Sequence, residues 1–193
     1  MSSQTPETPS PSAGPERRSR LRQYQVQLLE RMQAAKTGEA ASGRELGVLI
    51  GGHLCLLDLT QISEIVPLQP ATPVPLAQDW YLGLANIRGN LTGVIDMARY
   101  QGLAAGDSAV SERRLITFAP GLGFNCALVA ERVLGLRKLS DMAAEAPSDT
   151  QADADTAPRW RSQHFRDSDG QQWTRLDLAQ LVRESRFLQV GLV

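Results

Sequence analysis

The spacing of apolar residues changes character twice along the chain. Residues 1–15 are rich in Pro, Ser and Thr, and this composition predicts a disordered tail. In residues 16–44 apolar side chains recur at spacings of three and four with arginines on the other face, which predicts an amphipathic helix followed by a short linker. The apolar face of this helix consists of Leu21, Tyr24, Leu28 and Met32.

Beyond the linker, the apolar period is that of β-strands. Apolar residues alternate from Leu46 to Ile50, and the dipeptide Gly51-Gly52 that follows is typical of a hairpin turn. Many short strands favour a closed or nearly closed β-barrel architecture, because closure removes the exposed edges that such strands would otherwise present. Further strands are predicted at 53–59, 91–97, 113–119, 123–130 and 173–178.

The C-terminal third of the chain predicts one helix and one loop. Asp177 followed by Gln180 resembles the capping box of a helix N-terminus. Residues 141–158 carry five acidic residues and no Lys or Arg, which predicts a flexible acidic insert, with a docking strip for a basic partner as the alternative. One face of the predicted helix comprises Leu178, Leu181, Val182, Ser185 and Leu188.

Composition narrows the class of protein. The 193 residues are 42% hydrophobic with a net charge of -1, so the chain has no overall charge signature for binding nucleic acid or an anionic membrane. The N-terminus is polar, and the longest apolar stretch, 48–59, is too short for a membrane helix. Cys55 and Cys126 each lie in an apolar run and are expected to be reduced core thiols. We therefore expect a soluble cytoplasmic protein without membrane insertion.

The sequence offers few residues for catalysis or for binding a cofactor. His53 and His164 have no accompanying metal-ligand pattern, and no phosphate-binding P-loop is present. Residues 121–126 carry only the first two glycines of a dinucleotide-binding motif and are better interpreted as a hairpin turn. The common signatures of a serine nucleophile are also absent. We therefore expect no metal site, no cofactor and no enzymatic activity.

Two motifs carry a resemblance to a known family. The more specific is GLANIRGNLTGVID at 83–96, which fits the pattern G-x-x-N-[LI]-R-G-x-[LIV] followed by a short strand ending in Asp. The second is ISEI at 62–65. Together with LDLAQL at 176–181, they resemble the CheW-like adaptor family of bacterial chemotaxis systems, over about residues 45–185. Within that family, the N-terminal helix and residues 80–97 most resemble the PilI-type adaptor of the pathway that controls type IV pili and twitching motility.

The resemblance implies both a fold and a role. The fold is mainly β, with two packed five-stranded SH3-like β-barrels in residues 45–187, an N-terminal amphipathic helix, a short C-terminal helix and a tail at 188–193. The role is a non-enzymatic cytoplasmic adaptor in membrane-bound receptor arrays, which couples the cytoplasmic tip of a methyl-accepting chemoreceptor to the regulatory domain of a CheA-type histidine kinase. An adaptor of a flagellar chemotaxis pathway is the alternative. A small β-barrel that binds nucleic acid is less favoured, because only 5% of the residues are aromatic.

The same resemblance implies a receptor-facing site. We expect Glu64 and Arg88 to form an ion pair that shapes a docking groove, with the alternative that the pair only orders the loop after Gly83. The kinase contact is implied on the outer face of the first barrel, built from strands near 46–59 and 91–97. The receptor-binding or groove-shaping residues carried over from the family are Ile62, Glu64, Gly83, Asn86, Arg88 and Gly89.

Overall fold

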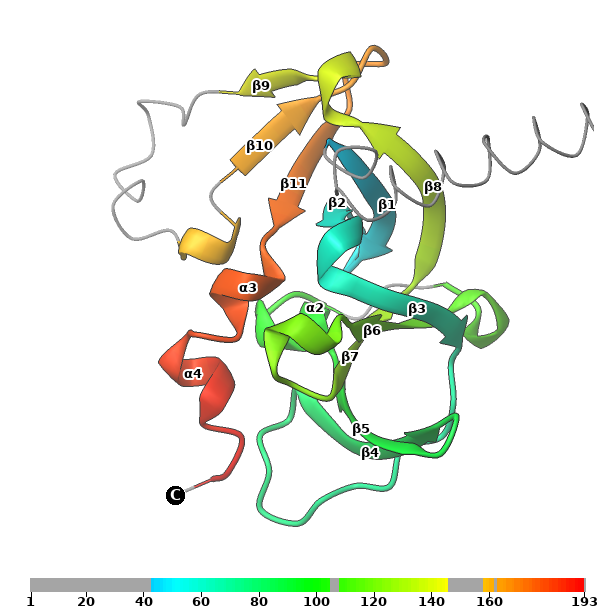
Figure 1. The fold of residues 1–193 in the computed structure, drawn as a ribbon, viewed down its shortest axis with the longest axis vertical. Coiled ribbons are helices and arrows are strands. Elements are labelled where there is room, and N and C mark those ends of the chain that lie inside the picture. The colour runs from blue at the N-terminus through cyan, green and yellow to red at the C-terminus, as the bar shows by residue number, and fades with distance from the viewer. Residues whose placement is uncertain (1–42, 105–107, 146–157, 162, 193) are drawn as a thin grey trace, which may run out of the picture. The chain divides into compact units, whose positions relative to one another are not determined.

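The computed structural model describes residues 43–104, 108–145, 158–161 and 163–192 (Figure 1). The predicted N-terminal tail and amphipathic helix lie outside these residues, as does most of the acidic insert. The described chain folds into two β-sheets with three short α-helices, which confirms the predicted mainly β fold. Among the described residues, no helix is both long and apolar enough to cross a membrane.

Sheet A has six strands in the order β8-β1-β2-β11-β10-β9. Neighbouring strands are antiparallel except β2 and β11, which are parallel. The predicted turn at Gly51-Gly52 joins β1 to β2, and its two glycines have the positive φ angles, 57° and 74°, that a tight hairpin requires. The strands are β1 (Arg44–Ile50), β2 (His53–Asp58), β8 (Arg132–Lys138), β9 (Ala143–Glu145), β10 (Gln163–Arg166) and β11 (Gln172–Leu176).

Sheet B has five strands in the order β3-β6-β7-β5-β4, and its one parallel pair is β5 with β7. This order and these directions match those of β8, β1, β2, β11 and β10 in sheet A, so β9 is a sixth strand that the expected five-stranded unit did not include. The strands are β3 (Ile62–Pro67), β4 (Tyr81–Ile87), β5 (Asn90–Ile95), β6 (Arg114–Phe118) and β7 (Cys126–Ala130).

The two sheets differ in how the chain builds them. Sheet B comes from one continuous stretch, residues 62–130, whereas sheet A comes from the segments on either side of it. The chain passes from β2 into β3 through a 3-10 turn at Leu59–Gln61, and from β7 into β8 through Glu131. The domain therefore consists of two similar strand units, one inserted into the other (Figure 1).

Each unit ends in the same turn from strand to helix. Helix α2 (Met97–Tyr100) follows β5 and helix α3 (Leu178–Leu181) follows β11. In each turn an aspartate, Asp96 or Asp177, accepts a hydrogen bond on its side chain from the backbone N–H three residues later. The predicted helix start at Asp177 is therefore confirmed. The backbone N–H groups of the two aspartates also donate, at 2.8 Å, to the carbonyl oxygens of Trp80 and Trp160.

The prediction of a single C-terminal helix reaching Leu188 is wrong. Helix α3 ends at Leu181, and a separate helix, α4 (Ser185–Leu188), begins after Glu184, whose extended backbone interrupts the helical path. Phe187 is buried, whereas Leu188 is 52% exposed. The apolar face that the sequence predicts is therefore buried in α3, whereas in α4 Phe187 is buried in place of Leu188.

The predicted C-terminal tail is held against the domain as far as the structure describes it. The carbonyl oxygen of Val190 accepts a hydrogen bond from the backbone N–H of Gln78 at 2.7 Å. The N–H of Leu192 donates to the carbonyl oxygen of Leu76, also at 2.7 Å. Residues 190–192 therefore form a short antiparallel pairing with the loop that precedes β4.

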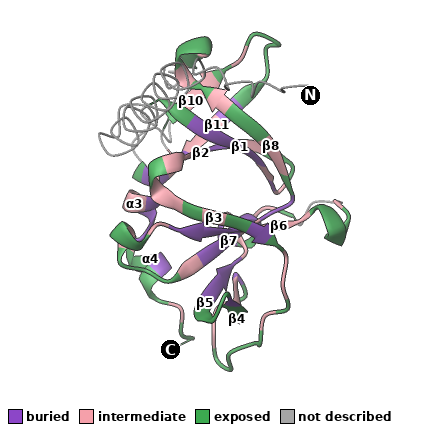
Figure 2. Ribbon diagram, turned by 45° about the vertical axis from the view of Figure 1, so that its right-hand side comes forward, coloured by how far each residue is buried: buried purple, intermediate pink, exposed green. Residues whose placement is uncertain are grey.

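Buried apolar side chains form two main groups. Buried residues lie along the strands of both sheets (Figure 2). One belongs to sheet B and includes Val66 and Leu115. The larger group lies where the two sheets meet the helices, and its centre is aromatic, with the ring of Trp80 at 5.1 Å from Tyr100 and 5.9 Å from Phe187. Fully burying one large apolar side chain stabilises a fold by about 1.5–3 kcal/mol, so this aromatic group is a major part of what holds the sheets together.

Both cysteines are free thiols, as predicted. Cys55 is buried and Cys126 is half-buried. Burial raises the pKa of Cys55 to about 12 and that of Cys126 to about 11. Both thiols therefore remain protonated and weakly nucleophilic at neutral pH.

Part of the predicted acidic insert is ordered. Ala143–Glu145 forms β9 and pairs with β10 at the edge of sheet A. Glu145 accepts a charged hydrogen bond from the guanidinium of Arg166, with the nearest nitrogen at 2.6 Å. Residues 146–157 lie outside the described chain.

Candidate docking site

The turn between β4 and β5 presents the most specific motif of the sequence at the surface. Ile87 and Asn90 pair across the hairpin, which leaves Arg88 and Gly89 as its two turn residues. Their φ angles are 50° and 87°, and two successive positive φ angles define the type I′ turn that suits the twist of paired strands. The side-chain oxygen of Asn86 accepts a hydrogen bond from the N–H of Gly89 at 2.8 Å. The sequence N-I-R-G-N therefore fixes the conformation of this turn.

The expected ion pair between Glu64 and Arg88 is present. Arg88 Nε lies 2.8 Å from Glu64 Oε2, and the side chains of Arg88 and Glu64 are 77% and 29% exposed, respectively. Such an exposed ion pair contributes only about 0–1 kcal/mol to the free energy of unfolding. Because β3 and β4 are the two edge strands of sheet B, the pair links the opposite edges of the sheet. Most of the Arg88 side chain remains open to a partner.

An irregularity in β3 directs the Glu64 side chain. The register between β3 and β6 shifts between Ile62 and Ile65, as at a β-bulge. The hydroxyl of Thr117, on β6, accepts a hydrogen bond from the N–H of Glu64 at 3.0 Å and lies 3.3 Å from its carbonyl oxygen. Bulges commonly re-aim a side chain at an edge strand. Thr117 thus holds the backbone of Glu64, a role that no motif in the sequence indicates.

Gly83 has a structural role beside this site. Its φ angle is 120°, and a Cβ built on it would lie 2.0 Å from the carbonyl oxygen of Thr72. Thr72 and Leu84 exchange two backbone hydrogen bonds, of 2.8 and 2.9 Å, which hold the preceding loop against β4. Gly83 is therefore required for this close approach of two backbone segments.

The remaining predicted residue, Ile62, contributes mainly to packing. It is partly buried against the core between the sheets and pairs with Phe118. Two residues outside the prediction are exposed apolar side chains near these positions in the sequence: Ile65, next to Glu64, is 42% exposed, and Leu91, three residues after Arg88, is 63% exposed. Their signal in the sequence is an apolar residue next to a charged or turn residue, which is too common to single them out.

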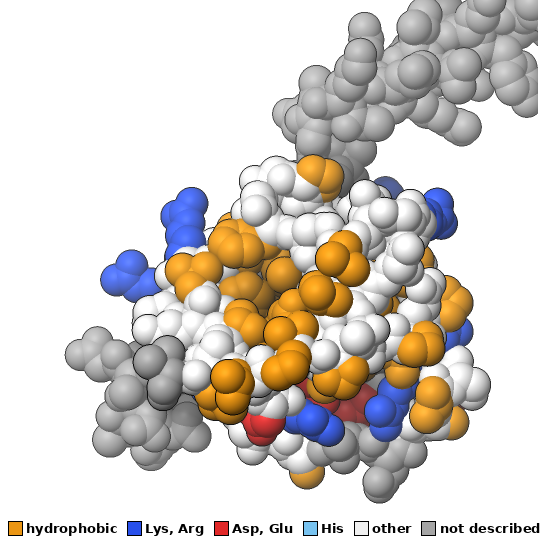
Figure 3. Space-filling view, turned by 90° about the horizontal axis from the view of Figure 1, so that it is seen from below, with side chains coloured by type: hydrophobic (Ala, Val, Ile, Leu, Met, Phe, Trp, Pro, Cys, Tyr) orange, Lys and Arg blue, Asp and Glu red, His pale blue; other side chains and the backbone are white. Residues whose placement is uncertain are grey.

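We call the Glu64–Arg88 ion pair, together with the exposed residues Ile65 beside Glu64 on β3 and Leu91 on β5, the hairpin face. It combines one ion pair with two exposed apolar side chains. Figure 3 looks at the molecule from below, the side on which β4 and β5 lie in Figure 1, and shows hydrophobic side chains gathered over much of that side with a few charged ones near its margin. Exposed apolar groups rimmed by charge are typical of surfaces that bind another protein.

The structure gathers no catalytic or metal-binding set in the residues it describes. His53 is exposed at the start of β2, and the Nδ1 of His164 lies 3.2 Å from the hydroxyl of Thr174 on the neighbouring strand. Within the described residues, no group of three or more His, Cys, Asp or Glu side chains is placed to hold a metal ion.

The surface expected to contact the kinase is not formed as predicted. Residues 46–59 lie mainly in β1 and β2 of sheet A, whereas residues 91–97 lie mainly in β5 of sheet B. Most of the residues in these three strands are also buried. The two segments therefore do not build one exposed face of one barrel.

Comparisons with known proteins agree with the observed fold. A family model described as the CheW-like domain matches residues 45–186. The chain is 30% identical over 118 residues to the chemotaxis protein CheW of Rhizobium meliloti (strain 1021), which covers 60% of this chain and 70% of the relative. The crystal structure of the scaffolding protein TtCheW from Thermoanaerobacter tengcongensis is similar in fold, with a TM-score of 0.58 and 18% identity over 75% of this chain and 94% of that one. The protein therefore belongs to the CheW-like domain family.

Proposed function

We propose that this protein is a non-enzymatic adaptor in a chemosensory pathway and that the hairpin face is its receptor-docking surface. The observation that carries the proposal is the Glu64–Arg88 ion pair at the hairpin turn, in which the Arg88 side chain is 77% exposed. The pair is too exposed to be explained by its contribution to stability. Membership of the CheW-like family supports the same role.

The proposed partners are the cytoplasmic tip of a methyl-accepting chemoreceptor and the regulatory domain of a CheA-type histidine kinase. An amphipathic helix of the receptor would place apolar side chains against Ile65 and Leu91, with its charged groups near Glu64 and Arg88. Two modest interfaces on one rigid body raise the effective concentration of each partner for the other. The proposed location is therefore the cytoplasmic side of a membrane-bound receptor array.

The proposed pathway is the one that controls type IV pili and twitching motility. The support is the resemblance of residues 80–97, and of the predicted N-terminal amphipathic helix, to the PilI-type adaptors. Deleting the gene that encodes this protein is expected to abolish twitching and to leave swimming unchanged. Loss of swimming alone would instead assign the adaptor to a flagellar pathway.

A charge exchange at the ion pair tests the docking surface. Glu64→Arg, Arg88→Glu and the double variant are each expected to weaken binding of a purified receptor tip fragment by about tenfold or more, because the partner's charges are matched to the original arrangement. The melting temperature of the double variant should stay close to that of the wild type, since an exposed pair contributes little to stability. Binding is measured by calorimetry and unfolding by circular dichroism.

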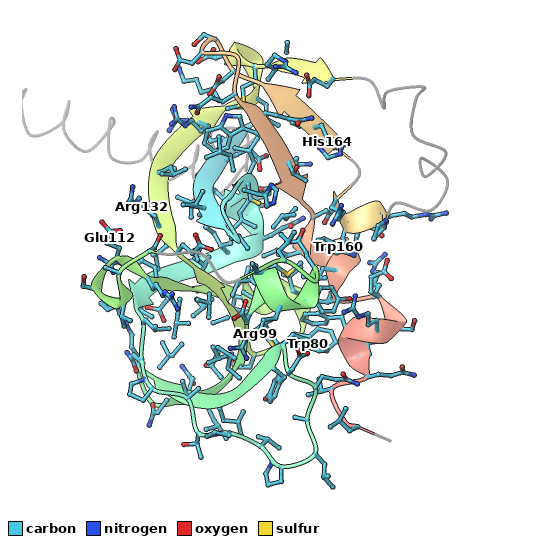
Figure 4. The ribbon with its side chains drawn as sticks, turned by 180° about the vertical axis from the view of Figure 1, so that it is seen from behind. Trp80, Arg99, Glu112, Arg132, Trp160 and His164 are labelled. Atoms are coloured by element: carbon cyan, nitrogen blue, oxygen red, sulfur yellow. The ribbon has the colours of Figure 1, made fainter. Side chains whose placement is uncertain are left out.

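A second exposed ion pair provides the matched control. Arg132 Nη2 lies 2.7 Å from Glu112 Oε2 (Figure 4), with side chains 51% and 43% exposed, and neither residue belongs to the hairpin face. Exchanging these two charges should leave receptor binding unchanged. The docking proposal is wrong if both exchanges have the same effect, or if the Glu64/Arg88 double variant binds the receptor fragment as the wild type does.

A further inference from the structure

The first crossing between the sheets is held by one side chain. Gln61 is the last residue of the 3-10 turn that leads out of β2, and β3 begins at the next residue. Its side-chain Nε2 donates to Asp177 Oδ1 at 2.9 Å, and its Oε1 accepts from the N–H of Leu178 at 2.7 Å. Its backbone oxygen also accepts from the N–H of Ala119 at 2.9 Å. Gln61 therefore joins three segments that are distant in the sequence.

Comparison of the two similar units shows that Asp177 does not need the side chain of Gln61 in order to cap helix α3. Asp96 caps α2 as Asp177 caps α3, and the Asp96 carboxylate takes a further ionic contact, of 3.3 Å, from Arg99 of its own helix. At the equivalent position in the other unit, the Asp177 carboxylate instead takes the carboxamide of Gln61. An aspartate can cap a helix without help from a second side chain. The contacts of Gln61 therefore serve to join α3 to the segment between β2 and β3.

Besides Gln61, the start of β3 is held by the pairing of Ile62 with Phe118 and by the contacts of Thr117 with the backbone of Glu64. It pairs on one side only, with β6, and the register shift after Ile62 interrupts that pairing until Ile65. Glu64 of the hairpin face lies within this interrupted stretch. Leu178, to whose N–H Gln61 is bonded, is fully buried in the core beneath α3. The position of Gln61 therefore determines how β3 leaves sheet A.

We propose that Gln61 is a positioning residue that couples the hairpin face to the sheet A unit through the N-terminus of α3. This inference rests on the proposed adaptor function, in which a partner bound at one surface must affect a partner bound elsewhere. Such coupling requires that the two surfaces share a connection whose geometry both partners influence. The carboxamide of Gln61, bonded at both its oxygen and its nitrogen, supplies a connection with fixed geometry.

The first test uses the free protein and does not depend on any partner. Gln61→Glu cannot donate to Asp177 and places two carboxylates within hydrogen-bonding distance, so it should open the junction. Amide hydrogen exchange in residues 62–66 and 178–181 should then rise together, by about tenfold or more. Gln180→Glu is the control, because it adds the same charge on α3 outside the contacts of Gln61. Gln61→Met removes both hydrogen bonds without adding charge and should show the same joint rise.

A reciprocal exchange tests whether the geometry of the junction itself matters. Asp177 Oδ1 accepts both from Gln61 Nε2 and from the N–H of Gln180. In the double variant Gln61→Glu with Asp177→Asn, the asparagine must therefore turn so that its amide donates to the new carboxylate and its oxygen takes over the cap, while the carboxylate still accepts from Leu178. Amide exchange in both segments should return to within about threefold of the wild type. If exchange rises in α3 alone in the single variants, Gln61 only caps the helix and the proposal fails.

The second test measures coupling between partners. The affinity of the kinase regulatory domain is measured with and without a saturating receptor fragment, and the ratio is the coupling factor. In Gln61→Glu and Gln61→Met this factor should fall towards one, while each separate affinity changes by less than about threefold. The double variant of the reciprocal exchange should recover it. A merely structural role would lower the melting temperature and leave the factor unchanged.

The two proposals fail in different ways. A wild-type protein that binds neither partner contradicts the adaptor function. A joint rise in amide exchange in the Gln61 variants would still show that Gln61 holds β3 and α3 together. A wild-type protein that binds both partners with a coupling factor of one, or variants that keep the wild-type factor despite raised exchange, would overturn the coupling role of Gln61.

Discussion

Gly83→Ala is expected to destabilise the domain by about 3 kcal/mol or more, because overpacking against backbone adds to the strain of a positive φ angle. The new Cβ would lie 2.0 Å from the carbonyl oxygen of Thr72 and 2.6 Å from its carbonyl carbon. Neither atom belongs to a flexible side chain, so relief requires the loop to move away from β4. That movement would break the two hydrogen bonds between Thr72 and Leu84.

A second glycine of the same motif separates the two causes. Gly89 also has a positive φ angle, 87°, but a Cβ there would meet no atom within 4 Å. Gly89→Ala should therefore carry only the cost of the left-handed conformation, about 1–2 kcal/mol. Urea unfolding of both variants gives the comparison. Equal losses at the two positions would show that contact with Thr72 is not what requires glycine at 83.

Arg175→Met is expected to cost about 3–5 kcal/mol, because it leaves a buried carboxylate without its partner. Arg175 on β11 lies 2.9 Å from Glu45 on β1 and 3.0 Å from Asp58 on β2. Glu45 is only 1% exposed, and its second oxygen already has no hydrogen-bond partner. The guanidinium is therefore the main group that compensates the charge of Glu45 inside sheet A.

The pH dependence of this loss identifies the group responsible. Burial outweighs the attraction of Arg175 and raises the pKa of Glu45 above its ordinary value of 4.5. Because the native state holds this proton more tightly than the unfolded chain, the stability that the group contributes is present below its ordinary pKa and is lost as the pH rises through the raised one. In Arg175→Met the pKa of Glu45 rises further, because the attraction of the guanidinium is lost. The deficit of Arg175→Met should therefore be largest at neutral pH and shrink as the pH falls towards 4.5.

Two further variants complete this test. Glu45→Gln in the Arg175→Met background should recover part of the loss at neutral pH, because it removes the uncompensated charge. Arg132→Met, which breaks an exposed pair with Glu112, should cost at most about 1 kcal/mol at any of these pH values. A deficit of Arg175→Met that is the same at about pH 5 and about pH 7.5 would contradict the role assigned to Glu45. Unfolding in urea at the two pH values provides the measurement.

The pattern of apolar residues could identify strands but not the sheet to which each belongs. In β1 the apolar residues Leu46, Val48 and Ile50 alternate in the sequence, although the strand is buried on both faces, and the Gly51-Gly52 turn determines its partner. Strands β5 and β7 are largely buried on both faces, so their sequences contain no alternation to orient them. The apolar pattern therefore could not test the grouping of residues 91–97 with residues 46–59, which the family resemblance implied and the structure contradicts.

The candidate site was predictable where a short local motif determines it. The ion pair between Glu64 and Arg88 was implied by the resemblance that two motifs carry, and the structure contains it. Thr117 could not be identified, because its contact with Glu64 depends on how β3 and β6 align across an irregular register. The end of α3 was missed for a similar reason: packing among Trp80, Tyr100 and other rings favours burial of Phe187 over Leu188.

The insertion of one strand unit into the other determines an order of assembly during translation. Sheet B is complete once Ala130 has been made, but the neighbours of the β1–β2 hairpin in sheet A, strands β8 and β11, begin only at Arg132 and Gln172. At typical synthesis rates of about 5–20 residues per second, that hairpin waits several seconds with both edges unpaired. The apolar side chains of β1 and β2 are then a temporary target for chaperones and for aggregation, until β8 and β11 have been made and can pair with them.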